Sequence, residues 1–307
     1  MHDLIIIGGG PAGVAAGVYA SRKKLQTELI TKEWGGQSIV SPDIQNWIGT
    51  ISISGDALAE ALKKHLEAYA SDVVTITAGK LVEKVEKKGD CFLVTLDDGS
   101  TRESRAVLVA SGSVRRKLDI PGAAEFDNKG LTYCASCDGP MFAGQDTVVV
   151  GGGNAGFETA AQLLAYAKSV TLLHRGDAFK ADPVTVEKVL AHPNMTGLIN
   201  AEPTAILGEK FVSGVRYKDT ASGEEKELAA GGVFVEIGLV PSTGFVGTLA
   251  KLDAYQRIEI DPWTQQTSVP GLWAAGDCTN IKYHQNNISA GDAVRALEDI
   301  YVHLKTK

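Results

Sequence analysis

Two cysteines three positions apart are the residues best placed to do chemistry in this chain. Residues 133–140 read YCASCDGP, so Cys134 and Cys137 are separated by two residues. At this spacing the sulfurs can reach each other across the first turn of a helix, where the helix dipole lowers the pKa of a thiol. The next residue, Asp138, is an acid that can carry a proton to a leaving thiolate. We therefore expect a redox-active disulfide, with Cys134, Cys137 and Asp138 as the catalytic residues.

A zinc site is the main alternative for this cysteine spacing. Tetrahedral zinc needs two further ligands, and the other two of the four cysteines, Cys91 and Cys278, stand alone. We therefore expect no metal. Cys91 begins an alternating segment, 91–96, which predicts a strand with Cys91 as a small core residue. Cys278 has no nearby resolving partner in the sequence and is expected to be structural.

A repeat with a period of 143 residues supplies the elements that must position this chemistry. Residues 3–13 read DLIIIGGGPAG, and 143 positions later residues 146–156 read DTVVVGGGNAG. In both copies an aliphatic strand enters a Gly-rich turn, an Ala-rich helix follows, and a second strand comes next. This βαβ pattern is typical of a dinucleotide site, in which backbone N–H groups and a helix N-terminus bind the diphosphate. The alternative is two ordinary βαβ units that use glycine only for turns.

The repeat predicts where the elements and the key glycines lie. Helices are expected over 14–23 and 157–166, and the second strands over 27–31 and 170–174. Three glycines of each copy serve the tight turn, the approach of the diphosphate and helix–strand packing. In this order they are Gly8, Gly10 and Gly13 in the first copy and Gly151, Gly153 and Gly156 in the second. Two such sites predict FAD in one and a nicotinamide cofactor in the other.

The C-terminal region indicates that the first site holds the flavin. Residues 269–277 read VPGLWAAGD, which predicts a turn, a short buried strand and an exposed Gly276-Asp277. The Asp277 carboxylate can accept hydrogen bonds from ribityl hydroxyls. A helix expected to begin near residues 289–291 would direct its positive end towards a reduced flavin.

These motifs resemble the low-molecular-weight thioredoxin reductases, FAD-dependent pyridine nucleotide-disulfide oxidoreductases. The motifs that carry the resemblance are GDCT at 276–279, Gln285, SAG at 289–291, GGQ at 35–37, NW at 46–47, ASG at 110–112 and CASCDG at 134–139. The resemblance extends over essentially the whole chain. It implies an α/β fold of two Rossmann-like, doubly wound, parallel-sheet domains, one inserted in the other. Residues 1–113 and 245–307 would form the FAD-binding domain, and residues 114–244 a nicotinamide-type domain that carries the disulfide.

The resemblance also implies roles for individual residues. Cys137 would face the flavin and receive its electrons, Cys134 would attack the substrate disulfide, and Asp138 would be the acid–base group. A hinge rotation would present the disulfide and the nicotinamide to the flavin in turn. The residues expected to bind FAD are Gly8, Gly10, Pro11, Ala12, Gly13, Glu33, Gly36, Gln37, Asn46, Ala110, Ser111, Gly112, Gly276, Asp277, Gln285 and Asn286. Those expected to bind NADPH are Gly151, Gly153, Asn154, Ala155, Gly156, Arg175 and Lys180.

The sequence leaves the electron donor open. Residues 174–180 read HRGDAFK, where NADPH-using relatives carry a clamp of the form H-R-R-x-x-x-R. Arg175 and Lys180 keep two cations, but Gly176 removes the middle one, and lysine cannot replace the bidentate fork of arginine. An NAD site would place an acid at the strand end, and Asp177 lies late for that role. We favour NADPH, with NADH second and no nicotinamide donor third.

Composition and charge narrow the class of protein. A length of 307 residues predicts two domains, and a net charge of −7 argues against nucleic-acid binding. We find no apolar stretch of about 20 residues that could span a membrane, and no secretion signal. The expected location is therefore cytoplasmic, and the family resemblance suggests a homodimer. The expected function is electron transfer through FAD and the disulfide to a thioredoxin-like protein.

Other functions stay open. Residues 154–156, NAG, resemble the flavoprotein of alkyl hydroperoxide reductase, which suggests supply to a peroxidase system. Those proteins carry an additional N-terminal thioredoxin-like region that we do not expect here. The remaining alternatives are a thioredoxin reductase-like dithiol oxidase that does not use NAD(P)H and a non-catalytic flavin- or metal-binding module.

Overall fold

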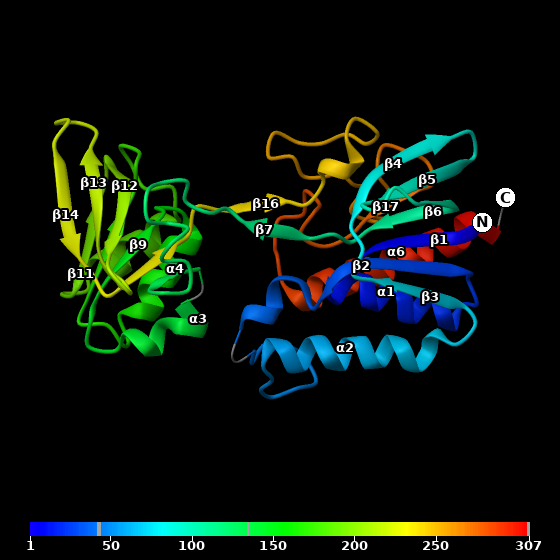
Figure 1. The fold of residues 1–307 in the computed structure, drawn as a ribbon, viewed down its shortest axis with the longest axis horizontal. Coiled ribbons are helices and arrows are strands. Elements are labelled where there is room, and N and C mark those ends of the chain that lie inside the picture. Colours follow the sequence, from blue (N-terminus) through cyan, green and yellow to red (C-terminus); the bar gives the residue numbers. More distant parts are fainter. Residues whose placement is uncertain (42–43, 134, 306–307) are drawn as a thin grey trace. The chain divides into compact units, whose positions relative to one another are not determined.

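The computed structural model describes residues 1–41, 44–133 and 135–305, with only the backbone described at residues 40, 136 and 137. The chain forms two compact units (Figure 1). Residues 1–114 and 240–307 form the first unit, and residues 115–239 form the second. The chain passes between them in β7 (Ser113–Arg115) and β16 (Leu239–Pro241), which pair as a two-stranded sheet.

The first unit is built on a sheet with the order β3-β2-β1-β6-β5-β4, in which β17 also pairs with β6. The parallel strands are β1 (His2–Gly9), β2 (Thr27–Trp34), β3 (Val74–Ala78), β6 (Thr101–Val109) and β17 (Leu272–Ala274). The antiparallel strands are β4 (Val82–Lys88) and β5 (Cys91–Leu96). β5 pairs with the first half of β6 and β17 with the second half. The C-terminal segment therefore arrives at the carboxyl ends of β1 and β6.

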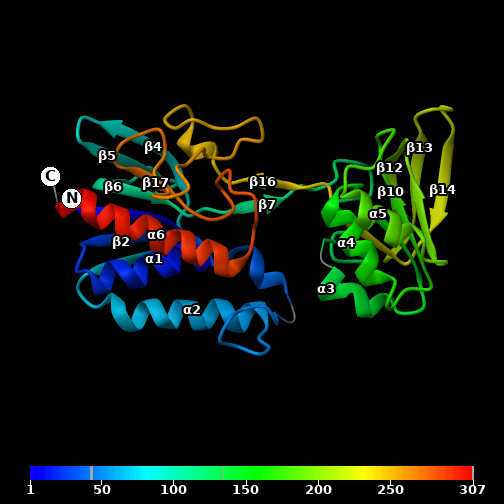
Figure 2. The same cartoon turned by 180° about the vertical axis from the view of Figure 1, so that it is seen from behind.

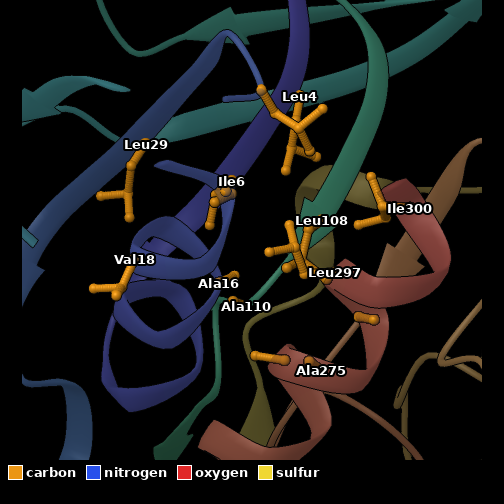
Figure 3. Close-up of a cluster of buried hydrophobic side chains, with 14 of the residues drawn as sticks. Leu4, Ile6, Ala16, Val18, Leu29, Leu108, Ala110, Ala275, Leu297 and Ile300 are labelled. Carbon is orange, nitrogen blue, oxygen red and sulfur yellow. The ribbon is translucent and has the colours of Figure 1, made fainter. Parts of the chain in front are cut away.

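Three helices pack on one face of this sheet (Figure 2). They are α1 (Pro11–Arg22), α2 (Gly55–Ala70) and α6 (Asn286–Lys305). Leu4 and Ile6 of β1 belong to the core beneath the helices, where Leu108 of β6 lies near Leu297 of α6 (Figure 3). Ile5 and Ile7 belong to the core of the opposite face. Because β1 is buried on both faces, its sequence is continuously aliphatic.

The second unit has a five-stranded parallel sheet with the order β11-β10-β9-β15-β8. Its strands are β8 (Leu131–Thr132), β9 (Asp146–Val150), β10 (Ser169–Leu173), β11 (Met195–Leu198) and β15 (Gly232–Val235). α4 (Asn154–Leu163) and α5 (Pro183–Leu190) share a core with one face of the sheet. The other face packs on an antiparallel sheet of β12 (Ala201–Gly208), β13 (Val212–Asp219) and β14 (Glu225–Ala229). α3 (Ala135–Asp138) and three 3₁₀ turns, Gly36–Val40, Gly139–Phe142 and Gly244–Val246, complete the elements.

These parallel sheets confirm the expected α/β class, while some details differ from the sequence prediction. α6 begins at Asn286, before the expected start near residue 289, because the N–H of Ser289 already donates to the carbonyl of Gln285 at 2.9 Å. α4 likewise begins at Asn154 rather than at residue 157 and ends at Leu163. In the described chain, no helix is long and apolar enough to cross a membrane.

The prediction that Cys91 is a core residue was wrong. β5 does span Cys91–Leu96, but Phe92, Val94 and Leu96 are its buried residues. Cys91 points to the other face and is only half-buried, with its sulfur 3.6 Å from Sδ of Met1. The alternating pattern identified the strand, and the larger hydrophobic residues determined which face is buried.

Candidate functional site

The two Gly-rich turns have nearly the same backbone geometry. Gly8 has a φ of 124° and Gly151 a φ of 130°, values that residues with a side chain rarely adopt. A Cβ added to Gly13 would lie 1.8 Å from the carbonyl oxygen of Gly8, and one added to Gly156 would lie 1.8 Å from that of Gly151. The third glycine of each copy therefore lets the helix start directly against the strand end.

The first turns of α1 and α4 leave room for a ligand. Gly10 and Gly153 are the N-cap residues, and neither supplies a side-chain cap. A Cβ on Gly153 would meet nothing within 4 Å, and one on Gly10 would meet only the backbone of Gly36, at 3.9 Å. The first N–H groups of these helices can therefore donate hydrogen bonds to a bound diphosphate.

Segments distant in sequence meet around the first turn. A Cβ on Gly8 would lie 2.2 Å from the carbonyl oxygen of Ala110, and one on Gly276 would lie 3.6 Å from Cβ of Ala12. The Gln37 side-chain amide donates to the carbonyl oxygen of Ser113. The structure thus brings the predicted FAD residues of 8–13, 36–37, 110–112 and 276–277 to one place, and Pro11 opens α1 among them.

Polar side chains connect the segment after β2 to the start of α6. Asn46 Nδ2 donates to Gln285 Oε1 at 3.1 Å, and Asn287 Nδ2 donates to the carbonyl oxygen of Asn46 at 2.7 Å. The Ser38 hydroxyl donates to Asn286 Oδ1 at 2.8 Å. Three predicted FAD residues, Asn46, Gln285 and Asn286, therefore take part in hydrogen bonds between the segment after β2 and the start of α6. Ser38 and Asn287 were missed because nothing in the local sequence indicates these contacts.

Asp277 and Glu33 provide the carboxylates of this region. Asp277 Oδ1 accepts a hydrogen bond from the Ser289 hydroxyl at 3.2 Å and lies 3.4 Å from His284 Nδ1. Glu33 lies near the end of β2 with an exposed side chain. The expectation that Gly276 is exposed was wrong, since it is buried against Ser289 and Ala12.

Cys278 follows Asp277 in the chain and lies in the protein interior. Its side chain is fully buried, and its sulfur lies 3.4 Å from the carbonyl oxygen of Ala275 and 3.5 Å from that of Val109. Burial raises the pKa of the thiol to about 11, so it stays protonated at neutral pH. Cys278 is a free, structural cysteine, as expected.

In the second unit, the segment after β10 folds back onto the second turn. The N–H of Lys180 donates to the carbonyl oxygen of Gly152 at 2.8 Å. The N–H of Asp182 donates to Oδ1 of Asn154, the first residue of α4, also at 2.8 Å. These bonds bring the Arg175–Lys180 segment beside the predicted nucleotide residues Gly151–Gly156.

His174 fills the space between this segment and the turn. A Cβ on Gly152 would lie 2.5 Å from the imidazole Cγ, and one on Gly176 would lie 2.9 Å from Nε2. Burial lowers the pKa of His174, which favours the neutral ring, and Nε2 has no hydrogen-bond partner among the described residues. The side chains of Arg175 and Lys180 are exposed at this place.

Glu236 is a residue of this site that the sequence reasoning missed. It follows β15, and a Cβ on Gly151 would lie 2.1 Å from its carbonyl oxygen. Its mostly buried carboxylate lies 3.5 Å from the Arg115 guanidinium, and this burial raises the pKa of Glu236. A signal was present, because VEIG at 235–238 repeats the strand-x-x-Gly pattern of VASG at 109–112.

The disulfide segment begins shortly after β8. Cys134 lies outside the described residues, and only the backbone of Cys137 is described, within α3. Asp138 is half-buried, and its carboxylate accepts a hydrogen bond from the Thr132 hydroxyl. Within the ranges that the structure describes, no three His, Cys, Asp or Glu residues gather as metal ligands. The disulfide and the roles of its cysteines stay predictions.

Comparison with known proteins assigns the chain to a family. Residues 2–291 match the model of the pyridine nucleotide-disulphide oxidoreductases. The chain is 39% identical over 294 residues to an NADH dehydrogenase of Bacillus subtilis and 36% identical over 304 residues to the F component of alkyl hydroperoxide reductase from Pseudomonas putida. These alignments cover 96% and 98% of this chain but 57% and 58% of the relatives, so the chain spans little more than half of their length.

The fold has equally clear relatives among solved structures. The thioredoxin reductase of Lactococcus lactis superposes with a TM-score of 0.81 at 31% identity, with 100% of both chains covered. That of Streptococcus pyogenes gives a TM-score of 0.79 at 34% identity, with 100% of this chain and 99% of the other covered.

The family implies FAD together with NAD(P)H. Both Gly-rich turns fit such cofactors, because each combines a tight glycine turn with an open, uncapped helix start. The chain therefore belongs to the pyridine nucleotide-disulphide oxidoreductases, a family of FAD oxidoreductases, and has the thioredoxin reductase fold.

Proposed function

We propose that the chain is a flavoprotein disulfide reductase that passes electrons through FAD and Cys134–Cys137 to a thioredoxin-like protein. The observation that carries this proposal is the meeting of distant segments around the first turn, exemplified by Asn46 and Gln285, which are 239 positions apart and hydrogen-bonded. Such a network, beside an open helix N-terminus and a carboxylate, suits an extended dinucleotide. The C-x-x-C-D-G motif supplies the disulfide.

The first unit supplies the residues that would hold FAD. The backbone of Gly8–Gly13 would bind the diphosphate, and Glu33 would accept hydrogen bonds from the adenosine ribose. Asp277 would bind the ribityl hydroxyls, and the N-terminus of α6 would stabilise negative charge on the flavin ring. Bound FAD supplies reversible two-electron transfer between a nicotinamide and a dithiol. In this proposal the FAD-binding domain comprises residues 1–113 and 245–307.

The disulfide segment would carry out thiol–disulfide exchange. The Cys134 thiolate attacks one sulfur of the substrate disulfide, and the other substrate sulfur leaves as a thiolate that Asp138 protonates. The Cys137 thiolate then attacks Cys134 in the mixed disulfide. This step releases the second substrate thiol and re-forms Cys134–Cys137. The hydrogen bond from Thr132 to Asp138 orients the carboxyl group.

The second unit supplies the residues that would bind the electron donor. Gly151–Gly156, with Asn154 and Ala155 at the start of α4, would bind the diphosphate. Arg175 and Lys180 would pair with a 2′-phosphate. We favour NADPH as the donor for this reason, with NADH second and no nicotinamide donor third. The nicotinamide-type domain would be residues 114–244.

Supply to a peroxidase system is the second candidate function. Relatives at 36% and 38% identity are named as the F component of alkyl hydroperoxide reductase, and the second turn carries the NAG sequence of that group. The assembly and location that fit either function are a homodimer in the cytoplasm.

An anaerobic titration separates these functions. The purified protein should be yellow, and its flavin should bleach with NADPH, NADH or a dithiol. The reduced protein is then mixed with oxidised thioredoxin, with an oxidised peroxidase partner or with air. Rapid flavin re-oxidation by thioredoxin supports the proposal, and re-oxidation by only the peroxidase or only air favours the alternatives. A colourless, folded protein that does not bind added FAD would defeat the proposal.

A further inference from the structure

A mostly buried acid lies beside the second turn. Glu236 directly follows β15, and its backbone packs against Gly151 of the turn. Its side chain is 13% exposed, and Oε1 accepts a hydrogen bond at 2.9 Å from the hydroxyl of Thr159 on α4, the helix that begins at this turn. The carboxylate therefore lies between the end of β15 and the middle of α4.

The first unit provides an internal comparison. β6 pairs with β1 as β15 pairs with β9, and Ala110 packs against Gly8 as Glu236 packs against Gly151. The proposed FAD turn thus has a methyl group where the second turn has a carboxylate. A strand end beside a phosphate-binding turn does not need an acid, because negative charge there opposes the phosphates.

Arg115 forms an ion pair with this acid. One guanidinium nitrogen, Nη1, lies 3.5 Å from Glu236 Oε1 and also donates to the carbonyl oxygen of Tyr133. The neighbouring Arg116 has an exposed side chain, and its backbone N–H donates to the carbonyl oxygen of Gly238. Glu158, the other acid that acts electrostatically on Glu236, is exposed on α4.

We propose that Glu236 and Arg115 set the affinity of the second turn for a nicotinamide dinucleotide: Glu236 opposes binding of the diphosphate, and Arg115 offsets it. This inference rests on the proposed function, because it assumes that a dinucleotide binds at Gly151–Gly156. A partly buried charge is screened less than a surface charge, so each member of the pair should act more strongly than an exposed neighbour of the same sign.

The test is calorimetric titration of the FAD-loaded protein with NADPH and with NADH. Glu236→Gln keeps a group that can accept from Thr159 and should tighten binding of both nucleotides by about three- to tenfold. Arg115→Gln should weaken binding of both by a similar factor. The matched controls Glu158→Gln and Arg116→Gln remove the same charges from exposed neighbours and should change the affinity by less than about twofold.

Opposite shifts in the two test variants, with small shifts in the controls, support the proposal. Unchanged or weaker binding by Glu236→Gln overturns it, as do equal effects of Arg115→Gln and Arg116→Gln. Failure of Glu236→Gln to bind either nucleotide also overturns it. Bleaching of the flavin by a dithiol is measured on each sample without any nucleotide. Loss of that reaction in the wild-type protein would instead contradict the proposed disulfide reductase.

Discussion

Single-residue changes at the two cysteines should separate their roles. Cys134→Ser should leave a thiolate at Cys137 beside the flavin and produce a long-wavelength charge-transfer band, whereas Cys137→Ser should not. Both variants should lose disulfide reductase activity. The measurement is the absorbance spectrum together with steady-state turnover. Cys91→Ser is the control. Cys91 is the first residue of β5 and contacts Met1, so this substitution should leave the spectrum and the turnover unchanged. A band that appears in Cys137→Ser would reverse the assignment.

The residue that follows Arg175 should decide how strongly NADPH is preferred. Gly176→Arg restores the missing cation and should lower the KM for NADPH by about one to two decades, with little change for NADH, since a charged hydrogen bond contributes about 1.5–3 kcal/mol. Its Cβ would lie 2.9 Å from His174 Nε2, so the imidazole must shift slightly. As a control, Ala178→Arg adds the same charge at an exposed position two residues further on. If both variants lowered the KM for NADPH equally, the effect would come from added positive charge in general and not from a contact made at position 176.

The residues of this site differ in how far the sequence predicts them. The glycines of both turns were identified because their roles depend on spacing within a few positions. Glu236 was missed because only the match of VEIG at 235–238 to VASG at 109–112 points to it. The pairing of β15 with β9, more than 80 positions away in sequence, follows from the fold alone. His174 was recognised as the start of the clamp, but its packing against Gly152 follows only from the folded segment.

At the scale of elements, periodicity predicted the existence of strands and helices better than their ends. The continuous aliphatic run of β1 and the alternation in β5 gave both strands correctly. The start of α6 was placed three residues late, because Asn286 and Asn287 do not look like interior helix residues. Both are held at that position by Ser38 and Asn46, a tertiary effect that overrides propensity.

The start of α6 should therefore depend on Asn287. Its amide donates to Asn46 at 2.7 Å and accepts from the N–H of Ile48 at 3.3 Å, which joins the segment after β2 to the helix. Asn287→Ala should increase the rate of FAD loss about three- to tenfold, as expected for one or two hydrogen bonds. Flavin fluorescence after dilution measures this rate. Asn194→Ala, an exposed change in the second unit, should have no effect. Equal rates in both variants would contradict the role of Asn287.

At the scale of the whole molecule, the same arrangement of strand, glycine turn and helix occurs in both units. The two units share the tight glycine turn, the open helix start and the parallel strand on each side. They differ in what surrounds the turn: amides and Asp277 in the first unit, and His174, Glu236 and two exposed cations in the second. Because the repeat fixes only the common part, the surrounding residues must determine which cofactor each turn accepts.

Matched glycine substitutions should separate the two sites within the intact chain. Gly13→Ala and Gly156→Ala each place a Cβ 1.8 Å from a carbonyl oxygen of the turn, a clash that must displace the turn or the helix. We expect this clash to cost about 3 kcal/mol or more of binding free energy. FAD should then bind to Gly13→Ala, and the nicotinamide nucleotide to Gly156→Ala, at least about a hundredfold more weakly. Gly13→Ala should therefore be purified without flavin. Gly156→Ala should stay yellow and be bleached by a dithiol, but not by NADPH or NADH.

Gly244→Ala is the control for both variants. A Cβ on Gly244 would meet nothing within 4 Å, so this variant should fold normally and keep both reactions intact. Absorbance spectra report flavin content, and circular dichroism confirms that each variant is folded. If Gly156→Ala lost its flavin, or still bleached with a nicotinamide nucleotide, the assignment of FAD to the first turn and the donor to the second would be wrong. A folded Gly13→Ala protein that keeps its full flavin content would contradict the first half of that assignment.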